Sequence, residues 1–393
     1  MEDYPVPNEK DQQVDMSLPL FQAPFRVRVR EGWENFLKGE EKLRALIDQK
    51  ADPKDIAELL ASLLAPAFED TCVEVGFNGE MHELILSPEG DWSRLFSMTY
   101  FQRHAPKEVL THWNILVGRQ SRKYESEEGL AKYQVRITDN TVCANELQIR
   151  TAWEGKDANV FIYCEKLLPL LPDRENEAYW LAYIMLDYAI GELAEMNYIR
   201  ELRILDTPYE TPALSLAQLL PHFMEKLSLS REELFDAARY CELYCGYHMT
   251  PNEEAHDGLR GDVFAGSGCF MSLLNEFLRA ENRIMDSYHK DGIVAGYFCF
   301  PLYGFEGSDR GAQILDFRDA SAAMIENAAG PDSFTYIGGA TGIYYGYLDF
   351  IAWDLKAVLD AAVEVFGKSG LDWVMFHSFR QEADGITLFK RNT

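Results

Sequence analysis

Strand-like and helix-like patterns follow one another along this chain in an irregular order, and that order constrains the fold most strongly. Two short β-rich runs, Cys72–Phe77 and His82–Ser87, are joined by Asn78-Gly79, a dipeptide that favours a two-residue hairpin turn. Helical and strand patterns then alternate without the strict strand–helix repetition of a doubly wound parallel sheet. The pattern therefore predicts an α+β fold.

A similar order of patterns occurs twice between residues 72 and 205, which we interpret as a weak structural repeat of strand, strand, helix, strand. The first copy has a helix near Trp92–Arg103 and a strand at Trp113–Gly118. The second copy has strands at Glu146–Trp153, Asn159–Cys164 and Tyr198–Leu205, with helical patterns within Glu165–Glu195.

The N-terminal part predicts an arm built on a helical hairpin. Residues 1–24 contain four prolines and no apolar period, so we expect an extended lead-in. Phe25–Arg30 alternates apolar and basic residues, which predicts a short strand. Helical patterns follow over Trp33–Gln49 and up to Leu64, and Asp52 is placed to cap the second helix.

A chain of 393 residues exceeds what one hydrophobic core usually supports, so two mixed α/β units are expected beyond the arm. The predicted division is an arm over 1–66, an α+β domain over 67–228 and a C-terminal α+β domain over 229–393. The C-terminal elements expected from the patterns are helices over 230–247, 268–288, 319–327 and 350–366, strands over 292–300, 312–317, 373–376 and 386–389, and a hairpin over 335–347.

The formal net charge is −27, and acidic residues outnumber basic ones in the arm and in both domains. A diffuse negative field repels nucleic acid and anionic lipid and steers basic proteins into contact, although such a charge also serves solubility alone. No apolar run approaches the roughly 18 residues of a membrane span, and the N-terminus does not resemble a signal peptide. Seven cysteines, mostly in apolar stretches, fit a reducing compartment, so we expect a cytoplasmic protein.

The glycine-rich segment Ile337–Gly342 invites comparison with a phosphate-binding loop. A phosphate loop leads directly into a helix, whereas the residues after Gly342 read as a strand. A turn between two strands is therefore the better interpretation, and no cofactor is predicted.

Cys241, Cys245 and His248 would share one face if this segment were helical, with His256 as a fourth candidate zinc ligand. The same face continues an apolar stripe, and free cysteine packs as a small hydrophobe. We therefore expect core residues rather than a metal site.

The polar residues least explained by local structure lie in the C-terminal domain, near a concentration of aromatic side chains. Asp319 and Asp349 have local roles as expected helix caps, and Asp354 as a first-turn acid. Asp316 and Arg318 have none unless they pair with each other. The candidate binding cluster predicted from the sequence is Asp316, Arg318, Asp349, Asp354, His377 and Arg380.

Two stretches, Tyr179–Glu192 and Gly338–Gly342 with the following Asp349–Asp354, resemble segments of bacterial proteins classed as domains of unknown function. Some of those proteins are similar to immunity proteins of contact-dependent toxin systems. The resemblance implies a bacterial cytoplasmic protein with an interaction role, and it carries over no catalytic residue.

The chain contains no Gly-x-Ser-x-Gly elbow, no His-Glu-x-x-His, no kinase motif set and no dinucleotide fingerprint. Together with the charge, this favours a non-catalytic, immunity-like protein that binds a basic protein partner through acidic and aromatic surface. The alternative is an enzyme or small-ligand-binding protein whose site lies in the C-terminal domain.

Overall fold

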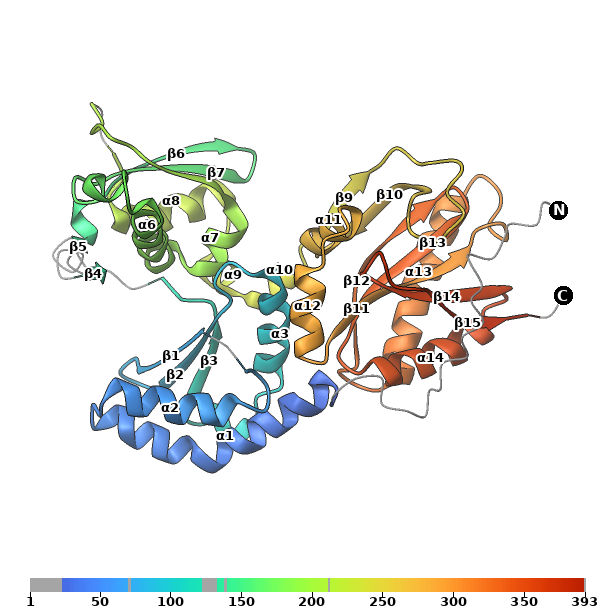
Figure 1. Cartoon of the computed structure of the whole chain (residues 1–393), viewed down its shortest axis with the longest axis horizontal. Coiled ribbons are helices and arrows are strands. Elements are labelled where there is room, and N and C mark those ends of the chain that lie inside the picture. Colours follow the sequence, from blue (N-terminus) through green and yellow to red (C-terminus); the bar gives the residue numbers. More distant parts are fainter. Residues whose placement is uncertain (1–22, 70–71, 122–132, 138–139, 211–212, 392–393) are drawn as a thin grey trace. The chain divides into compact units, whose positions relative to one another are not determined.

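The computed structural model describes residues 23–69, 72–121, 133–137, 140–210 and 213–391 (Figure 1). It confirms an α+β fold with helices at the N-terminal end of the described chain. The expected lead-in over 1–24 lies almost wholly outside the described residues. Within the described ranges, no helix is long and apolar enough to cross a membrane.

The chain forms two compact units. Residues 1–69 and 241–393 form one, here called the C-terminal unit, and residues 70–240 form the other, the middle unit. The arm therefore belongs to the C-terminal unit, and the units meet in sequence at 69/70 and 240/241, whereas the patterns suggested boundaries after 66 and 228.

The C-terminal unit contains a seven-stranded antiparallel sheet of order β15-β14-β11-β13-β12-β10-β9. Its main core lies on the face where the phenylalanines of β11, β13 and β14 meet α13 and α14. The strands are β9 (Cys245–His248), β10 (Val263–Gly268), β11 (Val294–Pro301), β12 (Phe334–Gly342), β13 (Tyr345–Ala352), β14 (Trp373–Ser378) and β15 (Ile386–Lys390). The helices are α1 (Phe25–Asp48), α2 (Pro53–Leu64), α11 (Met271–Leu278), α12 (Arg283–Lys290), α13 (Arg310–Ala329) and α14 (Leu355–Gly367).

The helical hairpin of the arm is confirmed, including the Asp52 cap, whose carboxylate accepts a hydrogen bond from Lys54 N at 2.9 Å. The predicted strand over residues 25–30 is wrong, because these residues begin α1. The alternation of six residues is too short to outweigh the helical spacing of Phe25, Val29 and Trp33, which are all buried.

The predicted C-terminal hairpin and the predicted strands over 292–300, 373–376 and 386–389 correspond to strands of the structure. The predicted strand over 312–317 is wrong. Residues 310–329 form the single helix α13, so Asp319 lies inside a helix rather than capping one. The helix expected over 268–288 is divided into α11 and α12, with Ala280 in the left-handed region at φ 55°. The single helix predicted over 230–247 is wrong, because this segment forms two short helices, over residues 231–235 and 237–241, and then the strand β9.

The middle unit contains two three-stranded sheets with the same topology. In each, the first two strands are antiparallel, and the third, which follows a helical connection, is parallel to the second. The elements of the first are β1 (Cys72–Phe77), β2 (His82–Ser87), α3 (Trp92–Arg103), α4 (Lys107–Leu110) and β3 (Trp113–Val117). Those of the second are β6 (Gln148–Glu154), β7 (Asp157–Tyr163), α6 (Glu175–Ile190), α7 (Glu192–Tyr198) and β8 (Ile199–Ile204).

This is the order of strands and helices that the sequence patterns indicated. Further elements of this part of the chain are the two-stranded β4 (Gln134–Ile137) and β5 (Asn140–Cys143), and the helices α8 (Leu216–Leu227), α9 (Arg231–Phe235) and α10 (Ala237–Cys241).

Candidate functional site

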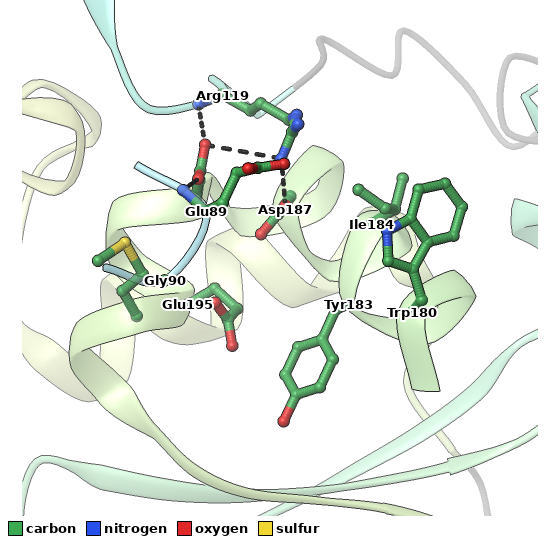
Figure 2. Close-up of a pocket in the computed structure, with 10 residues that line it drawn as sticks. Glu89, Gly90, Arg119, Trp180, Tyr183, Ile184, Asp187 and Glu195 are labelled. Atoms are coloured by element: carbon green, nitrogen blue, oxygen red, sulfur yellow. Dashed lines mark hydrogen bonds and ion pairs between the residues drawn. The ribbon is translucent and has the colours of Figure 1, made fainter. Parts of the chain in front are cut away.

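A cavity of about 440 Å³ lies in the middle unit where segments of the two strand–helix repeats meet (Figure 2). From the first repeat, Glu89 and Gly90 follow β2, and Arg119 follows β3. Because β2 and β3 are parallel, their carboxyl ends reach the same edge of the sheet. The second repeat contributes the adjoining parts of α6 and α7, with Trp180, Tyr183, Ile184, Asp187, Glu192, Glu195 and Met196.

Two glycines allow these segments to come together. Gly118 follows β3 with φ +75°, and an added Cβ would lie 2.8 Å from the Leu193 side chain. Gly191 separates α6 from α7 with φ +89°, and its Cβ would lie 2.5 Å from the Phe235 ring. A side chain is disfavoured at both positions by conformation and by space.

Glu192, at the start of α7, joins the two repeats. Its buried carboxylate accepts hydrogen bonds from Ser87 Oγ and Glu89 N, both at 2.8 Å, and from Arg119 N at 2.9 Å. These donors satisfy both carboxylate oxygens, so Glu192 holds the walls of the cavity rather than offering a free group to a ligand.

Arg119 is buried and already surrounded by carboxylates. Its Nε lies 2.6 Å from Glu74 Oε1, and its Nη1 lies 3.2 Å from Asp187 Oδ2 and 3.8 Å from Glu192 Oε2. Burial acts to lower the pKa of Arg119, but the bond to Glu74 and the surrounding negative charges outweigh it and raise the pKa. Arg119 is therefore a permanent cation whose charge is fully compensated by the protein.

Two carboxyl groups in the cavity have raised pKa values. Burial and the charges of Glu192 and Glu195 raise the pKa of Asp187 well above its ordinary value, despite the bond to Arg119. Burial, followed by the charge of Glu192, raises the pKa of Glu195 to about 7. Among the described residues, none donates a hydrogen bond to the Glu195 carboxyl or forms an ion pair with it, and no dashed line reaches it in Figure 2. Glu195 is thus the acid of this cavity that is available to a ligand.

Aromatic side chains form the other side of the cavity. Trp180 is 49% exposed and Tyr183 is 39% exposed, although both are large apolar side chains of α6. Figure 2 shows Tyr183 and Glu195 directed toward the same space. Burial and the charge of Glu195 raise the pKa of Tyr183, which places the two groups within electrostatic range of each other. The cavity therefore combines an unpaired acid with exposed π faces.

The structure places four of the six residues of the predicted cluster in separate surroundings. Asp316 is exposed on α13, whereas Arg318 on the same helix is buried against β12, with its Cδ 2.6 Å from where a Gly339 Cβ would stand. Asp354 caps α14 and pairs with Arg26 at 3.1 Å. Arg380 forms surface ion pairs with Asp286 and Glu382.

Asp349 and His377 are the two members that lie near each other, on the sheet face opposite α13 and α14. Each is one residue away from a phenylalanine of the main core, and neighbouring strand residues point to opposite faces. Asp349 lies in β13 and not at a helix start, and it forms a buried ion pair with Arg260. His377 stacks on Tyr297 at 5.3 Å, and burial lowers its pKa.

Two further expectations concerned metal and phosphate. Cys245 and His248 lie in the strand β9, so the shared helical face with Cys241 does not exist. The expectation of core residues is wrong for these two, because both are exposed, whereas Cys241 is buried. No group of potential metal ligands occurs among the residues that the structure describes. The antiparallel pairing of β12 with β13 confirms the expected hairpin, but the predicted turn at Ile337–Gly342 is wrong, because these residues lie in β12 and the turn falls at residues 343 and 344.

The sequence reasoning did not single out the cavity of the middle unit. Asp187, Glu192 and Glu195 are close in the sequence, but only the folded chain brings Glu89 and Arg119 to them. One local signal existed in the dipeptide Gly191-Glu192, where a glycine interrupts a helical pattern immediately before an acid.

Comparison with known proteins adds no relative: no family model, no characterised protein and no solved structure matches this chain.

Proposed function

We propose that this protein is a non-catalytic binding protein whose middle unit receives a basic group of a protein partner in the cavity beside Glu195. The observation that carries the proposal is the Glu195 carboxyl, which faces the cavity without a cationic partner and lies near the exposed ring of Tyr183.

The charges around the cavity favour a cation over an anion. Four carboxylates and one guanidinium of the described part of the chain line it, and the guanidinium of Arg119 is already paired with Glu74 and Asp187. An anion would be repelled by the carboxylates, whereas an ammonium or guanidinium group would give Glu195 the cationic partner that it lacks. A cation over a Trp or Tyr ring gains about 0.5 to 2 kcal/mol more.

The pKa of Glu195, about 7, makes this acid responsive to a ligand's charge. An arriving cation stabilises the ionised carboxylate, so binding near neutral pH would be accompanied by proton release. The overall charge of −27 would speed the encounter with a basic partner.

The experiment is a calorimetric titration of the full chain with the peptide acetyl-Gly-Lys-Gly-amide. We expect saturable binding with a dissociation constant on the order of 1 mM. Glu195→Gln and Trp180→Ala should each weaken binding about fivefold to tenfold. The control Glu201→Gln, in an exposed pair with Arg203, should leave the affinity unchanged.

Two results would overturn the proposal: no saturation by the lysine peptide, or equal affinity for the same peptide with norleucine in place of lysine. Norleucine has a similar length without the charge, so equal binding would mean that the cavity recognises apolar bulk.

The second candidate function is an enzyme or small-ligand-binding protein with its site among Asp316, Arg318, Asp349, Asp354, His377 and Arg380. It has less support, because Asp349, Asp354 and Arg380 already have ion-pair partners within the protein. A ligand whose binding changes the nuclear magnetic resonance signals of His377, and not those of the middle unit, would favour this candidate.

A further inference from the structure

A second cavity, of about 950 Å³, adjoins the first within the middle unit. It extends along β1 and the β1–β2 turn, from Glu74 to Glu80, and includes Glu83 and Ile85 of β2. Glu83 and Ile85 are opposite Gly76 and Glu74 in the strand register, so these four residues share one face of the sheet. The cavity therefore follows the first strand of the unit lengthwise.

The two cavities have a common wall. Arg119 lines the first and bonds through Nε to Glu74 Oε1 of the second, at 2.6 Å. The hydroxyl of Tyr188, also in the second cavity, donates to Glu74 Oε2 at 3.2 Å, while its neighbour Asp187 lines the first. A single layer of side chains thus separates the two spaces.

The second cavity is also acidic. Of the residues that the structure describes, Glu74, Glu80 and Glu83 line it together with one cation, Arg231. Arg231 donates to the carbonyl of Ser121 at 2.6 Å and its guanidinium lies over the Phe235 ring at 4.7 Å, so it is held in place by the protein. Among the described residues, seven carboxylates and two guanidiniums line the two cavities together, and both guanidiniums have partners within the protein.

The strand β1 is at an edge of its sheet. It pairs with β2 on one side, and among the described residues no strand pairs with its other side. An edge strand presents backbone N–H and C=O groups to which an extended peptide can add as a further strand. Phe77, 53% exposed at the end of β1, offers an apolar contact beside these groups.

We infer that the group bound by this protein is part of an extended polybasic segment of the partner, which lies along β1 and places one basic side chain in each cavity. This rests on the proposed function, because the first basic side chain occupies the cavity beside Glu195. It deepens that proposal by naming the partner's conformation and its minimum of two basic residues.

The test compares peptides that differ in lysine number, measured by calorimetry with the full chain. One probe, acetyl-Thr-Lys-Thr-Lys-Thr-amide, has one residue between its lysines, and the other, acetyl-Thr-Lys-Thr-Thr-Thr-Lys-Thr-amide, has three. In the single-lysine versions, norleucine replaces one lysine or the other. Residues two or four apart on an extended chain lie on one face. We expect at least one two-lysine peptide to bind at least tenfold more tightly than both single-lysine versions.

Variants assign the second lysine to the second cavity. Glu83→Gln combined with Glu80→Gln should lower the affinity for the two-lysine peptide to that of a single-lysine peptide, and should leave the latter unchanged. Glu80 and Glu83 lie outside the buried core, so the variant is expected to fold. Glu201→Gln with Glu154→Gln, on the other three-stranded sheet, is the matched charge control and should change neither affinity.

Each other outcome has a defined meaning. Equal binding of one-lysine and two-lysine peptides overturns this inference and leaves the proposed function standing. No binding of either overturns both. Two further results would show that β1 does not recognise the peptide backbone: spermidine binding as tightly as the two-lysine peptide, or unchanged affinity after N-methylation of alternate peptide bonds. Either would overturn the inference that the bound segment is extended along β1.

Discussion

Arg119 and Glu192 are joined to each other by two reciprocal hydrogen bonds. The backbone N–H of Arg119 donates to the Glu192 carboxylate at 2.9 Å, and the backbone N–H of Glu192 donates to the Arg119 carbonyl at 2.9 Å. This reciprocal pair joins the segment after β3 to the start of α7. The loop after β2 is attached to the same carboxylate through Glu89 N. The geometry of the cavity therefore depends on Glu192.

Replacing Glu192 by alanine is expected to destabilise the middle unit by about 3 kcal/mol, because two buried donors and one partly buried donor lose their acceptor and Arg119 loses a neighbouring negative charge. Hydrogen exchange of middle-unit amides measures this loss. Glu201→Ala, in an exposed pair, should cost less than about 1 kcal/mol. Similar losses for both variants would contradict the central role of Glu192.

Gly191→Ala should destabilise the same unit by about 2 to 4 kcal/mol. The left-handed backbone penalises any Cβ, and this Cβ would in addition meet the Phe235 ring at 2.5 Å. Gly155 provides the matched control, since it also has positive φ but has nothing within 4 Å of its added Cβ. Gly155→Ala should cost only the conformational part, about 1 kcal/mol, and thermal unfolding should separate the two variants.

The stability of the middle unit should depend on pH through Glu195. Its pKa is about 7 in the folded protein against an ordinary 4.5, so the folded unit holds a proton that the unfolded chain releases. The resulting stabilisation is complete below about pH 4.5 and is lost as the pH rises through 7. Glu195→Gln removes this dependence, so the variant should gain about 2 to 3 kcal/mol relative to the parent between pH 5 and pH 8.

The measurement is the difference in unfolding free energy between parent and variant at each pH, which cancels titrations that both proteins share. A difference that stays constant from pH 5 to pH 8 would mean that Glu195 has an ordinary pKa.

Replacing two acids of the sequence-predicted cluster should have very different effects on the free energy of unfolding. Asp349→Ala leaves the buried Arg260 without its carboxylate and should cost about 3 to 5 kcal/mol in the C-terminal unit. Asp316→Ala, at an exposed position of α13, should change stability by less than about 0.5 kcal/mol. Denaturant unfolding of each variant gives these values, and a neutral Asp349→Ala would show that Arg260 is satisfied by Tyr247 and the surrounding rings alone.

Local sequence determined much of the secondary structure. The hairpin at Asn78-Gly79, the Asp52 cap and the repeated order of strands and helices in the middle unit depend on neighbouring residues, and each occurs in the structure. The hairpin differs in one detail, because four residues, 78–81, and not two connect β1 to β2. The errors fell where a short local pattern competed with a longer one. The alternation at residues 25–30 lies inside a helix whose buried face continues to Leu43.

Only the tertiary structure decided which acids share a site. Charge composition predicts a basic partner but no position, because a carboxylate's pKa depends on its burial and on the charges around it in the folded protein. Glu195 differs from the many other acids of this chain because folding buries it beside Glu192 and leaves it without a cation, while Arg119 is compensated by Glu74 and Asp187. The sequence by itself therefore determined an acidic α+β protein, and long-range packing determined where its acidity is concentrated in a cavity.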